Sequence, residues 1–171
     1  MKEEKRLNLT RGLFLVYVFA LTWIILFKMQ IRLSDIAKME LRNINLIPLG
    51  DSAIVNGRID LSEILLNIAA FIPYGIYISM LKEDWNFILK ALIPCLTSLA
   101  YETVQYIFAI GASDITDLIG NTAGGLIGIV CYWLLSKLLK ENRIKVINIL
   151  ALIGTIGTVL LMAILIIANL K

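Results

Sequence analysis

Apolar residues along this chain fall into long runs that short polar stretches separate. A transmembrane helix needs roughly 20 consecutive apolar residues, and runs of that length exceed what a small soluble core requires. The pattern therefore predicts an all-α fold, a polytopic transmembrane helical bundle of about five spans. The spans cover residues 12–27 (extendable to 30), 62–81, 87–109, 118–139 and 146–170.

The spans leave room for one substantial hydrophilic stretch, so we expect a single compact bundle without a second domain. The first span follows a basic start that resembles a signal peptide, but no small-residue cleavage pattern follows Phe27, which predicts a retained anchor. Residues 33–41 are compatible with either a surface helix or an irregular loop. The expected divisions are a cytoplasmic N-terminus (1–11), a membrane domain (12–139) with an outer loop (28–61), and a cytoplasmic loop with the last span (140–171).

Lysine and arginine are distributed unevenly between the two sides of the predicted bundle. With the N-terminus in the cytoplasm, ten of the sixteen cations lie on the cytoplasmic side, which is the excess that such loops carry. The distribution predicts an N-in/C-out orientation. The ten are Lys2, Lys5, Arg6, Arg11, Lys82, Lys90, Lys137, Lys140, Arg143 and Lys145.

Composition agrees with a membrane protein, since 59% of residues are apolar and the mean hydropathy is +0.84. The net charge of +3 comes from residues that flank the spans, without a basic stripe interleaved with aromatic residues. We therefore expect the lipid bilayer as a partner and no nucleic acid. The chain lacks histidine, the commonest metal ligand and general base. No metal and no cofactor are expected, and any acid–base chemistry would fall to carboxylates.

Polar residues inside the apolar runs are the main functional signal, because such side chains are costly in a bilayer and usually functional. At 1.5 Å of rise per residue, Asn67, Glu102 and Asn121 lie about 7, 10 and 6 Å below the outer ends of their spans. They share one layer in the outer third of the bilayer. The inner half of the bundle has no comparable cluster in the sequence.

Helical spacing strengthens this convergence. Glu102 and Gln105 are separated by three residues and Asp117 and Asn121 by four, so each pair occupies one helix face. Asp114 follows the third span and should lie just above the layer. Arg58, at the end of the outer loop, should lie there as well.

Glycines and prolines predict how the spans pack. Gly120, Gly124 and Gly128 form a stripe of small residues, which permits close approach of a neighbouring helix. Pro73 and Pro94 each remove one backbone hydrogen bond from a span and should bend it.

Spaced motifs occur in a fixed order: Asn45-x2-Pro48, then Arg58 with Asn67-x3-Phe71-x-Pro73-x-Gly75, then Glu102-x2-Gln105, then Asp114-x2-Asp117-x3-Asn121-Thr122-x-Gly124-Gly125-x2-Gly128. Together they resemble the VanZ-like family over residues 43–139. The resemblance implies a small multi-pass protein of the bacterial cytoplasmic membrane. The founding member of that family confers low-level resistance to teicoplanin, a lipid-tailed glycopeptide, without a comparable effect on vancomycin. No catalytic mechanism follows from the resemblance.

The chain departs from the family pattern at two places. Many members carry an arginine in the loop after the Glu-x2-Gln helix and a further acid beside the aspartate of the next helix. Here those places read Gly111-Ala112-Ser113 and Thr116. If that arginine binds a phosphate or carboxylate in other members, Arg58 is the nearby cation left to do so.

The first functional hypothesis is a binding role at the outer leaflet. Its ligand would be a lipid headgroup, a lipid-linked envelope precursor or the anchor of a lipoglycopeptide. Amides would hydrogen-bond sugars, and Arg58 would pair with a phosphate or carboxylate. The candidate ligand-binding residues are Arg58, Asn67, Glu102, Gln105, Asp114, Asp117 and Asn121.

Other readings of the same residues stay open. A membrane-embedded enzyme would use Glu102 as general acid or base on a lipid-linked substrate, with Asp114 or Asp117 ionised and a divalent cation assisting. The absence of histidine and of a nucleophile motif argues against it. An ion-coupled carrier would need two inverted halves, which the chain does not show. The polar residues could also only fix the bundle, and the sequence neither requires nor excludes a homo-oligomer.

Overall fold

The computed structural model of this chain describes residues 2–27, 44–49, 54–55, 58–59, 61–110 and 113–169. The predicted helix or loop at 33–41 lies outside the described residues. The long helices are α1 (Lys2–Phe27), α3 (Ser62–Leu81), α4 (Phe87–Phe108), α5 (Ile115–Leu139) and α6 (Arg143–Asn169). The short elements are β1 (Ile44–Asn45), β2 (Ile54–Val55), β3 (Arg58–Ile59), β4 (Ser113–Asp114) and the 3-10 turn η2 (Lys140–Asn142).

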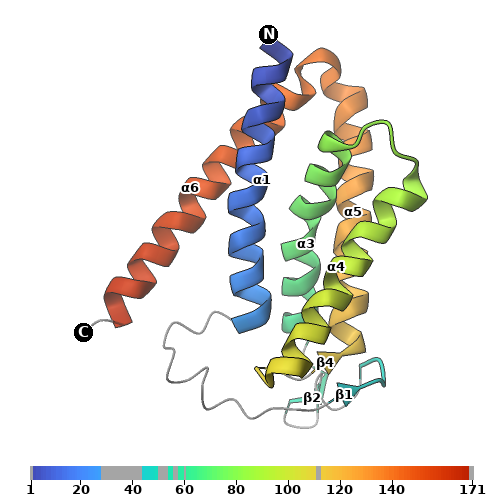
Figure 1. Cartoon of the computed structure of the whole chain (residues 1–171), viewed down its shortest axis with the longest axis vertical. Helices are drawn as coiled ribbons and strands as arrows, with labels where there is room; N and C mark the ends of the chain where they lie inside the picture. The colour runs from blue at the N-terminus through green and yellow to red at the C-terminus, as the bar shows by residue number, and fades with distance from the viewer. Residues whose placement is uncertain are drawn as a thin grey trace.

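The helices form an up-and-down bundle, which confirms the predicted all-α transmembrane fold (Figure 1). Each predicted span coincides with one long helix. By length and composition, four helical segments of the described chain can cross a membrane, and the last of them, Ile115–Leu160, includes both α5 and most of α6. The two termini lie at opposite ends of the bundle.

Side chains cap the helices that surround the polar layer. The Asn86 side chain accepts a hydrogen bond from the Leu89 amide at 2.9 Å and so begins α4. Asp114 begins α5 in the same way, by accepting from the Thr116 amide at 2.7 Å. Ala109 ends α4 in the left-handed region, at φ 54°.

The glycine stripe packs α5 directly against α3. A Cβ on Gly124 would lie 2.2 Å from the Ile68 carbonyl oxygen, and one on Gly128 would lie 2.1 Å from that of Ile72. The close approach predicted for these two glycines is therefore confirmed. Gly125 makes a similar close contact with α4, since a Cβ there would lie 2.4 Å from Pro94 Cβ. α4 therefore packs on α5 next to α3.

Aromatic side chains join α1 to this pair. Phe14 and Tyr17 of α1 contact Tyr74 and Tyr77 of α3, with ring centroids 5.4 to 6.5 Å apart. The Tyr17 hydroxyl also donates to the Ala70 carbonyl. These contacts hold α1 against α3.

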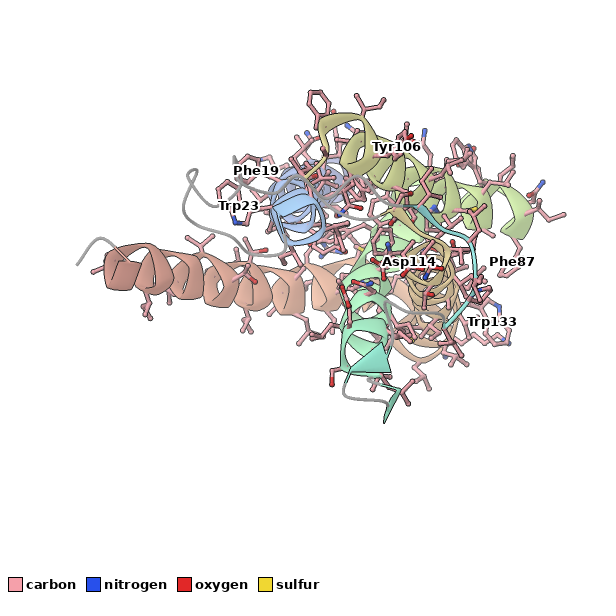
Figure 2. The ribbon with its side chains drawn as sticks, turned by 90° about the horizontal axis from the view of Figure 1, so that it is seen from below. Phe19, Trp23, Phe87, Tyr106, Asp114 and Trp133 are labelled. Atoms are coloured by element: carbon pink, nitrogen blue, oxygen red, sulfur yellow. The ribbon has the colours of Figure 1, made fainter. Side chains whose placement is uncertain are left out.

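The last helix leaves the bundle after its first turns. Thr10 of α1 donates to Asn148 at 2.9 Å, which fixes the start of α6. Beyond it, Gly154 and Gly157 have no atom within 4 Å of an added Cβ, and α6 extends away from the other helices (Figures 1 and 2).

The short strands lie at the end of the bundle where α1 ends and α3 begins (Figure 1). β1 and β4 pair in parallel, with Ile44 opposite Ser113 and Asn45 opposite Asp114. β2 and β3 form an antiparallel pair in which Val55 is opposite Arg58. The β1 segment, residues 44–49, is thereby held over the start of α5.

Candidate functional site

Asp114 lies at the centre of the polar end of the bundle. Figure 2 views the molecule from that end and shows its side chain among the helices. Its Oδ1 accepts from the Thr116 amide at 2.7 Å, and its Oδ2 accepts from Asn45 Nδ2 at 3.2 Å. Its own amide donates to Glu102 Oε2 at 2.7 Å. One residue therefore ties α4, α5 and the β1 segment together.

The inward face of α4 carries three polar side chains. Ser98, Glu102 and Gln105 are spaced by four and three residues, so they line one face, and all are at most 4% exposed. Gln105 Nε2 donates to the Ile25 carbonyl oxygen at 3.0 Å. That carbonyl lies in the last turn of α1, where backbone oxygens lack partners within the helix. Gln105 thus fixes the end of α1 to the cluster.

Asn67 and Asp117 form a second contact between α3 and α5. Asn67 Nδ2 donates to Asp117 Oδ1 at 2.7 Å. Gly120 lies one turn further along α5, and a Cβ there would come within 3.6 Å of Asn67 Cβ. This is an ordinary van der Waals distance, so α3 and α5 are less tightly packed at Gly120 than at Gly124 and Gly128.

Asn121 forms the deepest contact. Its Nδ2 donates to Ser98 Oγ at 2.9 Å, and both residues are fully buried. The residues that the sequence assigned to one layer thus lie at one end of the bundle. Their separate contacts connect α1, α3, α4, α5 and β1. We call them the outer cluster: Asn67, Glu102, Gln105, Asp114, Asp117 and Asn121.

Among the described residues, three buried oxygens of the outer cluster have no hydrogen-bond partner. They are Glu102 Oε1, Gln105 Oε1 and Asn121 Oδ1, on residues that are 4%, 1% and 0% exposed. A buried polar atom without a partner costs about 1–3 kcal/mol, and native proteins contain few of them. These three oxygens are available to hydrogen-bond donors from outside the chain.

The remaining candidate, Arg58, is described only by its backbone. It lies in β3 at the same end of the bundle, and its side chain is outside the described residues. Within the described part of the chain, no group of three or more His, Cys, Asp or Glu side chains could hold a metal ion.

Sequence reasoning missed several partners of these residues. Ser98 could have been found, because it lies one turn from Glu102 on the same face. Asn45 was noted as part of a motif, but its contact with Asp114 depends on the β1–β4 pairing. Neither the contact of Gln105 with the α1 carbonyl nor that of Thr116 Oγ1 with the Leu49 amide, at 3.1 Å, has a signal in the spacing.

The fold and the outer cluster define a polytopic helical membrane protein with a buried polar site at one end of its bundle. The sequence model of the VanZ/LLP1 family matches residues 14–136, and the chain belongs to this family. It is 36% identical to Protein VanZ of Enterococcus faecium over 154 residues, which is 90% of this chain and 91% of that protein. No solved structure matches the chain. The family match begins before the motif region at 43 and includes the second half of α1.

Proposed function

We propose that the outer cluster binds a lipid-linked ligand of the cell envelope at the outer leaflet of the bacterial cytoplasmic membrane. We further propose that this binding contributes to low-level teicoplanin resistance, as the resemblance to VanZ implies. The proposal uses the N-in/C-out orientation that the distribution of cations predicts. In that orientation, the end of the bundle with the outer cluster faces the cell envelope.

The proposal rests mainly on the unpartnered oxygens of Glu102, Gln105 and Asn121. Residues that only fix a bundle would be expected to pair these oxygens, because buried polar atoms without partners are costly. All three are acceptors when Glu102 is ionised, so the complementary ligand groups are donors. Sugar hydroxyls, amide N–H groups and ammonium groups are donors of this kind, and glycopeptides and lipid-linked wall precursors contain them.

Apolar side chains at the same end support a ligand with a lipid tail. Leu46 and Ile47 of the β1 segment are exposed, and so are Ile107 and Phe108 at the end of α4. A tail can lie in the bilayer against these side chains while the polar part of the ligand reaches the outer cluster. This arrangement favours a lipid-tailed glycopeptide over one without a tail.

The β1 segment supplies a cover for the site. It is held over the cluster by Asn45 on Asp114 and by the Leu49 amide on Thr116. Because the outer cluster is buried beneath it, displacement of this segment is the expected step by which ligand donors reach Glu102. Arg58 remains the predicted partner for a phosphate or carboxylate of the ligand.

The test is the inhibitory concentration of teicoplanin and of vancomycin in a susceptible Gram-positive host. The host expresses wild type, Glu102→Gln or Asn121→Ala at matched membrane levels. Glu102→Gln keeps the shape and an acceptor for the Asp114 amide but removes the charge. We expect the wild-type protein to raise the inhibitory concentration of teicoplanin but not that of vancomycin. Neither variant should produce this increase.

Thr103→Ala is the matched control. Thr103 follows Glu102 in the chain, is exposed, and donates to the Leu99 carbonyl of its own helix at 2.7 Å. Its replacement should leave the increase intact. A well-expressed wild type without any increase would rule out the resistance role, and full resistance in both cluster variants would rule out this site.

A further inference from the structure

A cavity lies at the end of the bundle opposite the outer cluster. Its volume is about 740 Å³, which is within the range of ligand sites. The α3–α4 connection, the start of α4, the end of α5 and the start of α6 form its walls. Its polar lining is Ser79, Glu83, Lys90, Tyr132, Ser136 and Arg143.

An ion pair holds one cation in place at this cavity. Arg143 Nε and Nη2 donate to the two carboxylate oxygens of Glu83, at 3.1 and 3.0 Å. The Tyr132 hydroxyl also donates to Glu83. Lys90, in the first turn of α4, donates from its Nζ to the Glu83 carbonyl oxygen at 3.2 Å. Two cations and one carboxylate give this lining a net charge of +1, which favours an anion.

Ser79 provides an independent sign of a missing partner. It is 1% exposed and lines the cavity, and its hydroxyl has no hydrogen-bond partner in the part of the chain that the structure describes. A hydroxyl donates readily to a phosphate oxygen. The burial of this hydroxyl is explained if a ligand atom reaches it through the cavity.

The rest of the lining is apolar and faces sideways out of the bundle. It consists of Phe87, Ile129, Val130 and Trp133, of which Phe87, Val130 and Trp133 are exposed. Figure 2 shows Phe87 and Trp133 on the same flank of the molecule. In a membrane this flank meets acyl chains. The cavity therefore opens toward the lipid on its apolar side and carries cations on its polar side.

We propose that this cavity binds the phosphate headgroup of an anionic membrane lipid. Lys90, Arg143 and Ser79 contact the phosphate, and one acyl chain lies along Val130 and Trp133. In the predicted orientation the lipid comes from the cytoplasmic leaflet, where anionic headgroups attract basic residues. The site is separate from the outer cluster, so either proposal can fail without the other.

Trp133 allows the binding to be measured directly. A full-length protein with Trp23→Phe and Trp85→Phe keeps Trp133 as its one tryptophan, since the chain has three. It is reconstituted in phosphatidylcholine bilayers that contain a small fraction of brominated phosphatidylglycerol or, in parallel, brominated phosphatidylcholine. We expect stronger quenching of Trp133 by brominated phosphatidylglycerol, because the anionic lipid is enriched in the cavity.

Lys90→Gln should reduce the preference for the anionic lipid about tenfold, as expected for loss of one charge-assisted hydrogen bond. Ser79→Ala should reduce it with no loss of thermal stability, because the hydroxyl has no hydrogen-bond partner among the described residues. Lys145→Gln is the matched control, since Lys145 is an exposed cation at the same end that does not line the cavity.

Three outcomes would overturn the proposal. Equal quenching by the two brominated lipids would show no enrichment. An equal effect of Lys145→Gln and Lys90→Gln would show only a general attraction of charge to the surface. Reversal of the quenching by inorganic phosphate would assign the cations to free phosphate and not to a lipid.

Discussion

Asp114 makes several of the contacts at the end of the bundle that contains the outer cluster. It caps α5, receives Asn45 from the β1 segment, and donates its amide to Glu102. Cap residues are typically worth about 1 kcal/mol. Here the same residue also fixes the cover of the proposed site, so local structure and access to the site depend on one position.

The Asn45 contact gives a prediction about that cover. Asn45→Ala removes the hydrogen bond to Asp114 Oδ2 while Thr116 still accepts from the Leu49 amide. We expect the β1 segment to open more often, so amide hydrogen exchange at Leu49 should become severalfold faster, with no change in the middle of α5. Unchanged exchange in Asn45→Ala would show that this contact does not hold the cover.

At the residue scale, the sequence identified faces but not partners. The spacing of Glu102 and Gln105 correctly placed both on one inward face of α4. Their partners come from Asp114, twelve residues ahead, and from Ile25, eighty residues back. Periodicity within a helix cannot specify which neighbour a face will meet, and this is why the contacts had to come from the structure.

At the scale of elements, hydropathy marks where the chain can cross a membrane and not where helices end. α1 begins at Lys2 and includes the charged start, whereas the predicted span begins at residue 12. α5 begins at Ile115, because Asp114 caps it, and not at residue 118. The helices therefore begin up to three turns before the predicted spans, in polar residues that hydropathy assigns to loops.

The packing of α3 on α5 gives the second prediction. A Cβ on Gly128 would lie 2.1 Å from the Ile72 carbonyl oxygen and 3.0 Å from Gly75 Cα, and backbone cannot move aside easily. Gly128→Ala should therefore lower the free energy of unfolding by about 1–3 kcal/mol. The measurement is unfolding of the purified protein in mild detergent.

Gly154→Ala is the control for that experiment, because an added Cβ at Gly154 meets nothing within 4 Å. Alanine is favoured over glycine inside a helix by about 0.5–1 kcal/mol, so this variant should be as stable as wild type or more stable. Equal destabilisation by the two substitutions would contradict the close packing of α3 and α5.

On the scale of the whole molecule, the two ends of the bundle carry different charge. Carboxylates and amides gather at the outer end, and cations gather around the cavity at the other end. The sequence predicted the first group, since its residues interrupt apolar runs. It did not predict the second, because Glu83 and Arg143 lie in flanking segments, where charged residues are ordinary.

The Glu83–Arg143 ion pair at the cavity predicts that the stability of the folded protein depends on pH. The Arg143 guanidinium hydrogen-bonded to Glu83 lowers the pKa of that carboxyl below its ordinary value of 4.5. Because the pKa is lower in the folded state, the ionised carboxyl stabilises the folded protein at pH values above the unfolded-state pKa. This stabilisation is lost as the pH falls through the folded-state pKa. The pair links the α3–α4 connection to α6. Because the pair is exposed, we expect it to contribute less than about 1 kcal/mol to the free energy of unfolding.

The measurement compares wild type with Glu83→Gln over a pH series in detergent. Wild type should be the more stable protein at neutral pH, and the difference between the two should vanish at acid pH below the lowered pKa of Glu83. A difference that stays constant with pH would show that the carboxylate charge does not contribute.

The most direct test of the proposed outer site is binding of teicoplanin to the protein in lipid nanodiscs, with empty nanodiscs as the background for tail insertion. Wild type should bind more teicoplanin than empty nanodiscs, with no excess for vancomycin. Glu102→Gln should weaken that excess binding about tenfold, as expected for a hydrogen bond to a charged group. Teicoplanin binding by the wild-type protein that equals binding by empty nanodiscs, or by Glu102→Gln, would contradict a teicoplanin-binding role for the outer cluster.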